Sequence, residues 1–494
     1  MTIVNASKSP NTVDIAIVGG GITGLAAAAA LPREYRWALF ESHSQLGGKV
    51  ATQHEHVPHM GDFVLEKGPD CLVAAQAENI LSLFDQLGLA THILPTTQRD
   101  LPVFVWHNSK AVPLPHNTHL SIPTQLASLW RCPLISLQGK LRLCVEPFLP
   151  SSLSLPQDST ATQQDESVGH FLQRRLGQQA VDNLAEPLLG NIFQLHPNQQ
   201  SLLATLPHIH RAFIKHGSLL LGMRAQGRNH NKTKPEGFVT LRNGMGTWVD
   251  AWANTLGRDR LHTDTYVQSI HPLNLGGYRL QTQSGQQWHC RCVLFATPAK
   301  QAAHILQDLV PQTACCLQAL PTTSSASVYM AFANKDLHAP KNGGQPLLLG
   351  GAGLLIPHRQ ARTINAITCV SRKFAHRAPP GYTLLRAAVG GWRNPTLLQQ
   401  HNEQMICRQV LADLQRFLNT RAQPVLTRLF AWRHSIPQHP VGHLQRIQHI
   451  TSSLPKGIFL AGSPYAGAGL PNCLAQGQQA AQQIKKHLEA LQNG

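Results

Sequence analysis

Residues 13–49 read VDIAIVGGGITGLAAAAALPREYRWALFESHSQLGGK, and this stretch decides the fold class. The apolar run 13–18 ends in glycines, and the alanine-rich run 25–31 that follows favours helix. Residues 37–40 form a second apolar run with Glu41 at its end. Strand, tight turn, helix and strand within about 30 residues are typical of a dinucleotide-binding unit. The stretch therefore predicts an α/β protein with a Rossmann-like sheet.

The glycine turn fits the GxGxxG pattern, and it consists of Gly19, Gly20, Gly21, Ile22, Thr23 and Gly24. Glycines let the backbone approach a pyrophosphate, while the amides and dipole of the following helix attract the anion. Simple tight packing is the alternative explanation for such a turn. Glu41 favours the binding site, because it lies where an acid can accept the two hydroxyls of an adenosine ribose.

A second glycine turn, Leu46-Gly47-Gly48-Lys49, indicates which dinucleotide is bound. Such a turn beside the pyrophosphate is typical of FAD enzymes, in which the flavin continues into the protein. Lys49 is either a phosphate contact or an ordinary exposed lysine. A third turn, Glu66-Lys67-Gly68-Pro69-Asp70, follows a strand-like run and is by itself also compatible with an ordinary turn.

The C-terminal part repeats the strand, turn and helix order. Residues 457–461 are expected to form a strand, residues 462–473 a glycine-rich turn, and residues 474–488 a helix. A helix start aimed at a flavin would stabilise negative charge as the ring is reduced. This arrangement suits a flavin that accepts hydride.

Composition restricts the partners and the compartment. Lys and Arg number 42 and Asp and Glu 25 among 494 residues, which gives a net charge of +17 and favours anionic partners. The ten cysteines contain no CxxC pair, so we expect a reducing compartment and no zinc site. We expect a cytoplasmic protein, either free or peripheral on the inner face of the cell membrane. Histidine-rich stretches at 208–210 and 434–443 are interpreted as packing or surface residues, with no metal and no nucleic acid bound.

The remaining segments give weaker signals. Residues 77–90 predict an amphipathic helix, and the Pro- and Leu-rich residues 91–150 predict a set of short apolar helices. Residues 151–166 and 222–236 are polar and predict loops, the first of them mobile. Strands are expected at 238–241, 261–270, 278–283 and 292–296.

Seven pieces of sequence together resemble the protoporphyrinogen oxidase family, including its bacterial coproporphyrinogen-oxidising form. They are, in chain order, GGGITGLAAA, FESHSQLGGK, LEKGPDCL, EPLLGNIF, LRNGMGTWVDA, VLFATPA and GIFLAGSPYAGAGLPNCLAQGQQAA. The first and last are shared with flavin amine oxidases, whereas GPD, EPLL and the final GxGLPxC are closer to the porphyrinogen enzymes. The resemblance covers nearly the whole chain.

The resemblance implies a non-covalent FAD and oxidation of a porphyrinogen, protoporphyrinogen IX or coproporphyrinogen III, to the porphyrin in heme biosynthesis. Six hydrogens would be removed in three flavin cycles, with oxygen or a quinone as electron acceptor. Beyond the first turn and Glu41, it implies cofactor contacts from Ser42, Lys49, Gly68, Pro69, Asp70, Cys71, Val267, Ala468, Gly469 and Leu470. No side chain stands out as a catalytic acid or base.

The resemblance and the elements together imply three regions. The FAD domain would comprise residues 1–95, 232–300 and 440–494. A mixed-sheet substrate domain would comprise 206–231 and 301–439, and a helical, membrane-facing region 96–205. The last segment is apolar and carries Arg131, Lys140 and Arg142, which suits an anionic leaflet, although a buried helical core is equally compatible. A homodimer is left open.

Several residues depart from the family pattern. Asn472 stands where the family usually has Asp, residues 193–196 replace a Tyr-Ala-Gly-Asp segment, and Val73 replaces an arginine of the animal members. These departures concern the choice of substrate. A flavin amine oxidase or a carotenoid-desaturase-like enzyme is the alternative function, and a non-catalytic FAD or porphyrin binder is a third.

Overall fold

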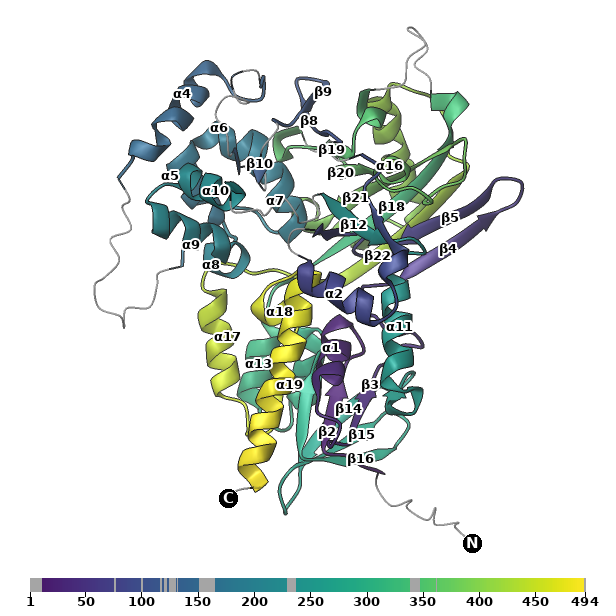
Figure 1. The fold of residues 1–494 in the computed structure, drawn as a ribbon, viewed down its shortest axis with the longest axis vertical. Helices are drawn as coiled ribbons and strands as arrows, with labels where there is room; N and C mark the ends of the chain where they lie inside the picture. The colour runs from purple at the N-terminus through teal and green to yellow at the C-terminus, as the bar shows by residue number, and fades with distance from the viewer. Residues whose placement is uncertain are drawn as a thin grey trace.

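Two sheets and a group of helices make up the computed structural model (Figure 1). The structure describes residues 11–74, 77–98, 101–115, 118–119, 122–123, 130, 132–150, 165–228, 237–337, 347–360 and 362–492. A five-stranded sheet lies at one end of the molecule, and a seven-stranded sheet lies beside the helices at the other. The α/β fold class predicted from residues 13–49 is confirmed.

The five-stranded sheet is parallel throughout and has the order β13-β3-β2-β17-β23. Its strands come from the beginning, middle and end of the chain: β2 (Ile15–Val18), β3 (Trp37–Phe40), β13 (Leu261–His262), β17 (Cys292–Phe295) and β23 (Ile458–Leu460). The first two strands lie where the sequence predicts them. Both are fully buried, as expected for strands covered on both faces.

Helices and a smaller sheet cover the two faces. On one face, a core shared with the sheet includes α1 (Ile22–Ala30), α2 (Glu78–Gln86), α11 (Gly246–Leu256) and α19 (Leu470–Gln492). On the other lie β1 (Asn11–Thr12), β14 (Val267–Pro272), β15 (Tyr278–Thr282), β16 (Gln287–Cys290), α12 (Ala299–Leu306), α13 (Pro311–Gln318) and α17 (His443–Ser452).

The seven-stranded sheet has the order β22-β18-β21-β20-β19-β8-β9. Its strands are β8 (Val103–His107), β9 (Lys110–Pro113), β18 (Thr322–Ala333), β19 (Gly353–Leu355), β20 (Ile364–Cys369), β21 (Tyr382–Gly390) and β22 (Leu426–Pro437). One face packs on α16 (Glu403–Leu418) through a continuous apolar core. The opposite face of this sheet is called here the inward face, and it contacts other parts of the chain instead of α16.

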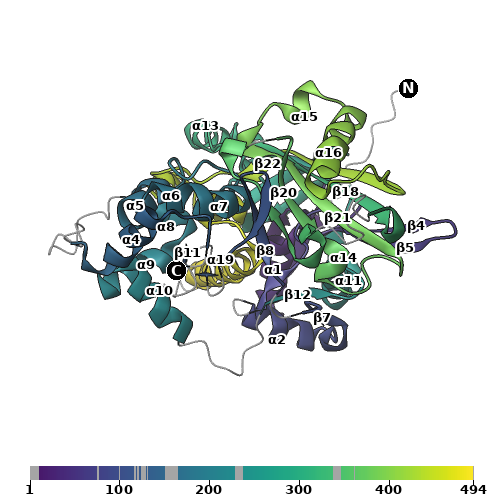
Figure 2. The same cartoon turned by 90° about the horizontal axis from the view of Figure 1, so that it is seen from above.

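Helices between residues 137 and 228 form a separate apolar core beside β8 and β19. They are α4 (Leu137–Val145), α5 (Val168–Leu176), α6 (Gln178–Ala180), α7 (Glu186–Phe193), α8 (Leu202–Thr205), α9 (Pro207–His216) and α10 (Leu219–Arg228), with a π-helical turn at Val181–Ala185. Seen from above, α4 and α5 lie on one side, β18 and β21 on the other, and β8 between them (Figure 2).

Smaller elements connect these parts. A hairpin of β4 (Thr52–Val57) and β5 (Gly61–Glu66) and a sheet of β6 (Leu72–Val73), β7 (Ile93–Pro95) and β12 (Phe238–Leu241) lie between the two large sheets. The short elements are β10 (Thr118–His119), β11 (Ile122–Pro123), α14 (Val370–Lys373), α15 (Leu397–Gln400) and α18 (Ser463–Ala466).

Two expectations need correction. Residues 91–150 are not simply short helices, because β7, β8 and β9 lie among them and the last two extend the seven-stranded sheet. The run VFVWH is short, β-branched and aromatic, which favours a strand that gains stability by pairing with β19. Residues 222–228, expected in a loop, continue α10. The predicted loop at 151–164 and the rest of the second loop, 229–236, lie outside the described residues.

None of the ten cysteines, all of which lie among the described residues, forms a disulfide. Among the described residues, no helix is long and apolar enough to cross a bilayer. The same residues contain no cluster of three metal-ligating side chains.

Candidate functional site

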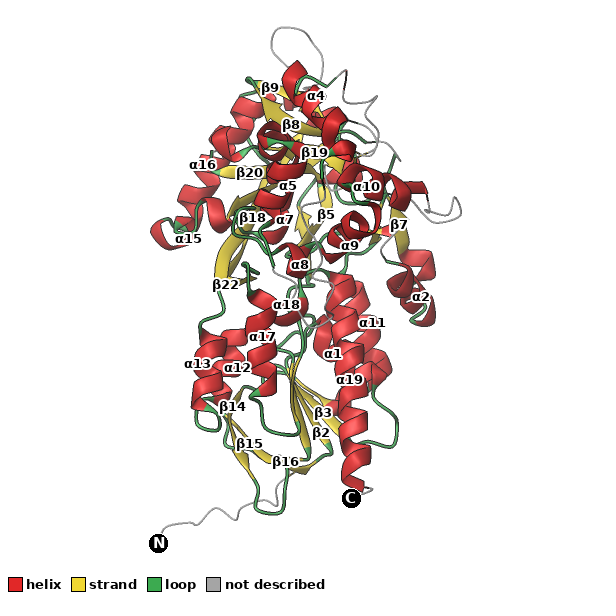
Figure 3. Ribbon diagram, turned by 90° about the vertical axis from the view of Figure 1, so that its left-hand side faces the viewer, coloured by secondary structure: helices red, strands yellow, loops and turns green. Residues whose placement is uncertain are grey.

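The candidate site begins at the carboxyl edge of the five-stranded sheet. Gly19, Glu41, Ala296 and Ala461 directly follow four of its parallel strands and therefore lie at one edge of the sheet. Figure 3 shows α1 and α19 beside β2 and β3. Ligands of open α/β sheets bind at this edge. The amino ends of α1 and α19 lie there as well.

The first glycine turn is packed tightly on its inner side and open on its outer side. A Cβ on Gly24 would lie 2.0 Å from the carbonyl oxygen of Gly19, and one on Gly19, whose φ is +109°, would lie 2.7 Å from the Ala296 carbonyl oxygen. A Cβ on Gly21 would meet nothing within 4 Å. No side chain caps α1, and its first turn contains no acid. The turn is therefore an open cradle whose amides suit an anion.

Glu41 is buried at the end of β3 and is held in place by the backbone. Its Oε2 accepts a hydrogen bond of 2.8 Å from the Gly20 N–H, and its Oε1 accepts one of 2.9 Å from the His43 N–H. The Ser42 hydroxyl donates to the same Oε1 at 3.2 Å. The Glu41 carbonyl accepts from the Thr265 N–H at 2.8 Å, which brings the start of β14 and the buried Val267 close to this carboxylate.

The second glycine turn packs directly on the first. The Gly47 N–H donates to the Gly20 carbonyl at 2.8 Å, and a Cβ on Gly48 would lie 3.3 Å from Gly21 Cα. Burial lowers the pKa of Lys49, which lies near Cys473 at the start of α19. No hydrogen bond or ion pair of the Lys49 ammonium is found among the described residues. Lys49 is thus a cation beside two helix N-termini, where an anionic group would be favoured.

Helices α1 and α19 cross in close contact next to these turns. A Cβ on Gly477 would lie 2.3 Å from the Thr23 carbonyl oxygen and 2.7 Å from the Ala26 Cβ. Gly469, with φ of +106°, has open space where a Cβ would stand, and the first turn of α19 has no acid. The turn of Ala468, Gly469 and Leu470 therefore directs a second helix start, without an acid in its first turn, toward the same region.

Gln476 holds the C-terminal turn and was not found by sequence reasoning. Its Oε1 accepts from the Gly462 N–H at 2.9 Å, and its Nε2 donates to the Gly467 carbonyl at 3.3 Å. The side chain thus fixes both ends of the segment that carries α18. A polar residue on an otherwise small-residue helix face was the only sequence signal for this role.

The third turn joins the cradle to the seven-stranded sheet. A Cβ on Gly68 would lie 2.1 Å from the Lys49 carbonyl oxygen, so Gly68, Pro69, Asp70 and Cys71 lie beside the second turn. Asp70 is 3.5 Å from Lys373 Nζ and 3.9 Å from Arg386 Nη1. Burial raises the pKa of Asp70, but these two cations lower it more, so its pKa lies well below its usual range.

Sheet residues fix the backbone of this third turn. Arg386 Nη2 donates to the Gly68 carbonyl at 2.9 Å, the Trp432 indole to the Lys67 carbonyl at 2.7 Å, and the Tyr329 hydroxyl to the Glu66 carbonyl at 3.0 Å. Their positions on three different strands cannot be read from one sequence. The contacts place the inward face of the sheet directly next to the predicted flavin turns.

The middle of the inward face is lined by small side chains. Ala366, Thr368 and Ala388 lie on the central strands β20 and β21, yet all three remain partly accessible. Side chains at central positions of a sheet are normally fully covered, so this part of the inward face is less closely covered than its surroundings. Toward β8, Leu355 and Ala366 pack against the helical core, which closes that side.

Two buried histidines support the C-terminal turn from behind. His439 Nε2 lies 2.9 Å from the Ser463 carbonyl oxygen, and His443 Nε2 lies 3.2 Å from the Tyr465 carbonyl oxygen. Both side chains are almost fully buried. Burial lowers the pKa of both rings, and for His443, where His439 lowers it further, the pKa falls to about 4.

Acid should therefore destabilise the folded protein through His443. Below its ordinary pKa of about 6.5 the unfolded chain takes up a proton that the folded chain accepts only near 4. This destabilisation is absent at pH 7 and grows as the pH falls from 6.5 to 4, up to roughly 3 kcal/mol. Thermal unfolding measured across this pH range should show that acid lowers the stability of His443→Gln less than that of the wild type. His449→Gln, exposed on the same helix, should behave like the wild type.

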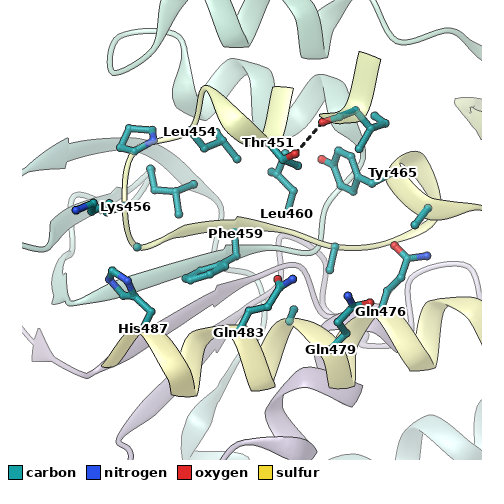
Figure 4. Close-up of a pocket in the computed structure, with 17 residues that line it drawn as sticks. Thr451, Leu454, Lys456, Phe459, Leu460, Tyr465, Gln476, Gln479, Gln483 and His487 are labelled. Carbon is teal, nitrogen blue, oxygen red and sulfur yellow. Dashed lines mark hydrogen bonds between the residues drawn. The ribbon is translucent and has the colours of Figure 1, made fainter. Parts of the chain in front are cut away.

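A cavity of about 470 Å³ lies along the free edge of the five-stranded sheet (Figure 4). It is lined by β23 and by residues of α17 and α19, among them Thr451, Gln479 and Gln483. Tyr465 and Gln476 form its end next to the C-terminal turn. A second cavity of about 420 Å³ lies near Trp392 and His196.

Two helix starts, three interlocked glycine turns and a buried carboxylate over a parallel sheet define the class of dinucleotide-binding oxidoreductases. The chain belongs to the flavin-containing amine oxidoreductases, whose family model matches residues 22–485. Its cofactor is FAD, as the flavin-containing family and the porphyrinogen-oxidising relatives imply.

Relatives match the chain along nearly all of its length. Coproporphyrinogen III oxidase of Bacillus subtilis is 31% identical over 94% of this chain and 96% of its own. Protoporphyrinogen oxidase 2 of Arabidopsis thaliana is 24% identical over 97% and 95%. The crystal structure of a candidate protoporphyrinogen oxidase from Exiguobacterium superposes with a TM-score of 0.78 at 30% identity and covers 98% of this chain and 100% of its own. A putrescine oxidase has a TM-score of 0.67 at 16% identity, which shows a shared fold only.

Proposed function

We propose that this protein oxidises coproporphyrinogen III to the porphyrin, with FAD as cofactor and oxygen as electron acceptor. One observation carries the proposal: coproporphyrinogen III oxidase of B. subtilis is 31% identical over 94% of this chain, whereas protoporphyrinogen oxidase 2 of A. thaliana is 24% identical. The net charge of +17 supports a substrate with several carboxylates. Protoporphyrinogen IX is the alternative substrate, and a quinone is the alternative acceptor.

The proposed FAD contacts are those that the family resemblance implies, and the cradle is compatible with them. Gly19 to Gly24 and Lys49 would bind the pyrophosphate, Glu41 and Ser42 the ribose, and the backbone at Val267 the adenine. The turns at 68–71 and 468–470 would flank the flavin ring. FAD, when bound, would accept a hydride, and a porphyrinogen carries hydrogens that can be removed in this way.

The protein would contribute orientation and exclusion of water. The inward face, open at Ala366, Thr368 and Ala388, would hold a flat macrocycle against the flavin turns. The amino end of α19, whose first turn has no acid, would stabilise negative charge that develops nearby. No side-chain acid or base is required in this arrangement, because the protons of the substrate N–H groups can pass to water.

A comparison of substrates in air tests this function. Purified holoenzyme should form fluorescent porphyrin from coproporphyrinogen III faster than from protoporphyrinogen IX, with oxygen consumed in step. Putrescine should not be oxidised. Oxidation of putrescine without porphyrin formation would instead indicate an amine oxidase. If porphyrin forms only when a quinone is added, the quinone and not oxygen is the electron acceptor.

We further propose a peripheral membrane contact through α4. Leu137, Leu141 and Val145 recur every fourth residue and are 49–64% exposed, and Phe148 just beyond them is 84% exposed. Such a stripe, beside Lys140, suits the interface of an anionic membrane. Arg131, expected to contribute charge, lies outside the described residues.

Binding to vesicles of phosphatidylglycerol and phosphatidylcholine tests this contact. The double substitution Leu141→Asp and Phe148→Asp should weaken vesicle binding by roughly tenfold or more, since it removes two apolar anchors and adds two like charges. Leu275→Asp, at a fully exposed leucine in the β14–β15 turn, is the control and should bind like the wild type. Unchanged vesicle binding with a change from dimer to monomer would instead identify α4 as an interface between two copies.

A further inference from the structure

Arg386 stands in the middle of the inward face, next to the proposed flavin turns. Thr368 and Tyr329 are its cross-strand neighbours on either side, and Ala388 is the next residue along β21 that points the same way. The guanidinium lies over the Tyr329 ring, 5.8 Å from its centroid. The residue therefore lies at the boundary between the third glycine turn and the open, small-residue part of the sheet.

Part of the hydrogen-bonding capacity of Arg386 is unused. Its Nε donates to Ser327 Oγ at 2.9 Å, and its Nη2 donates to the Gly68 carbonyl at 2.9 Å. Its Nη1 lies 3.9 Å from Asp70 Oδ1, which is too long for a hydrogen bond. The two N–H groups of Nη1 are therefore available to a ligand, and 18% of the side chain is accessible.

The surroundings of Arg386 carry one excess positive charge. Asp70 is the only acid that faces Lys373 and Arg386 among the described ion pairs, so two cations face one carboxylate. Glu66 is matched by Arg377 at 3.3 Å. Cys71 and Tyr329 add no charge, because burial raises the pKa of each to about 12. An excess charge in a partly buried place costs free energy unless an anion accompanies it.

We infer that Arg386 binds a carboxylate of the substrate, through the two free donors of its Nη1, at the edge of the inward face. The substrate class is a tetrapyrrole that carries propionate side chains, so this inference rests on the proposed function. Asp70 and Lys373 are positioning residues here: Asp70 orients the guanidinium, and Lys373 neutralises Asp70. The excess positive charge beside Asp70 is then neutralised only when a substrate carboxylate is bound.

Equilibrium binding of coproporphyrin III and of its uncharged tetramethyl ester tests this role without turnover. In Arg386→Met holoenzyme, binding of the tetra-acid should weaken by about tenfold or more, because a charge-assisted hydrogen bond is lost, while ester binding stays within about twofold. Arg386→Lys, which keeps the charge, should recover part of the tetra-acid binding. Arg428→Met is the matched control, since Arg428 lies on the opposite side of Tyr329 and pairs with Glu55.

The outcomes separate this inference from the proposed function. Equal weakening of acid and ester in Arg386→Met would mean that Arg386 only supports the third turn, and it would overturn the inference. Unchanged acid binding in that variant would overturn it as well. A wild-type protein that neither binds the porphyrin nor oxidises a porphyrinogen would overturn the proposed function itself. Flavin absorbance of each variant should match the wild type, which shows that the cradle remains loaded.

Discussion

Gly21→Val should yield a folded protein that no longer retains FAD. Gly21 has φ of −73° and ψ of 178°, values that valine adopts readily, and a Cβ there would meet no protein atom within 4 Å. The added methyl groups would instead fill the outer side of the cradle, where the pyrophosphate is proposed to bind. We expect FAD affinity to fall by roughly a hundredfold or more, since steric exclusion there also removes the phosphate contacts.

Flavin absorbance and thermal unfolding of the apoprotein measure the two parts of this result. The apoprotein of Gly21→Val should unfold within a few degrees of the wild-type apoprotein. Gly24→Val is the contrasting variant and should lose both FAD and stability, because its Cβ would lie 2.0 Å from the Gly19 carbonyl oxygen. Normal flavin content in Gly21→Val would show that the cofactor does not occupy this cradle.

Arg175→Met should strongly destabilise the helical region. Arg175 and Glu146 form a buried ion pair of 2.6 Å with side chains 2% and 0% exposed. Glu146 also accepts hydrogen bonds from the Leu219 and Leu220 N–H groups, so it joins α5 to the start of α10. Removal of one partner leaves a buried charge without compensation, which costs about 3–5 kcal/mol.

Hydrogen exchange of the amides in α5 and α9 measures this loss region by region. Arg174→Met, one residue earlier, is the control, since its ion pair with Glu166 is largely exposed and contributes at most about 1 kcal/mol. Adding Glu146→Gln to Arg175→Met should restore part of the protection. Equal exchange rates in the wild type and Arg175→Met would contradict the role assigned to this pair.

The sequence predicted the parts of the site that depend on local backbone pattern. The turn at 19–24, Glu41 at the end of β3 and the C-terminal turn before α19 each follow a short apolar strand, and strand order then brings them to one edge. Local signals suffice here because the strands are short, apolar and parallel, and β2 and β3 are also fully buried.

The contacts made by long side chains across the molecule were not predictable. Arg386 contacts the Gly68 turn from more than three hundred residues away, and Lys373 reaches Asp70 across a similar separation. The hydrophobic periodicity of a sequence does not indicate contacts between side chains so far apart in the chain. In the same way, β8 lies in a segment that was expected to be helical, and β19, which places it in the large sheet, occurs far later in the chain. β9 pairs with β8 itself in a local hairpin, which sequence reasoning missed.

The most direct test of the account mixes oxidised holoenzyme with one equivalent of coproporphyrinogen III in the absence of oxygen. We predict that the flavin absorbance in the blue is bleached after mixing, and that oxidised tetrapyrrole appears at the same rate. Admitting air should then restore the absorbance of the oxidised flavin. A flavin that stays oxidised with coproporphyrinogen III and protoporphyrinogen IX but is reduced by putrescine would contradict the proposed function.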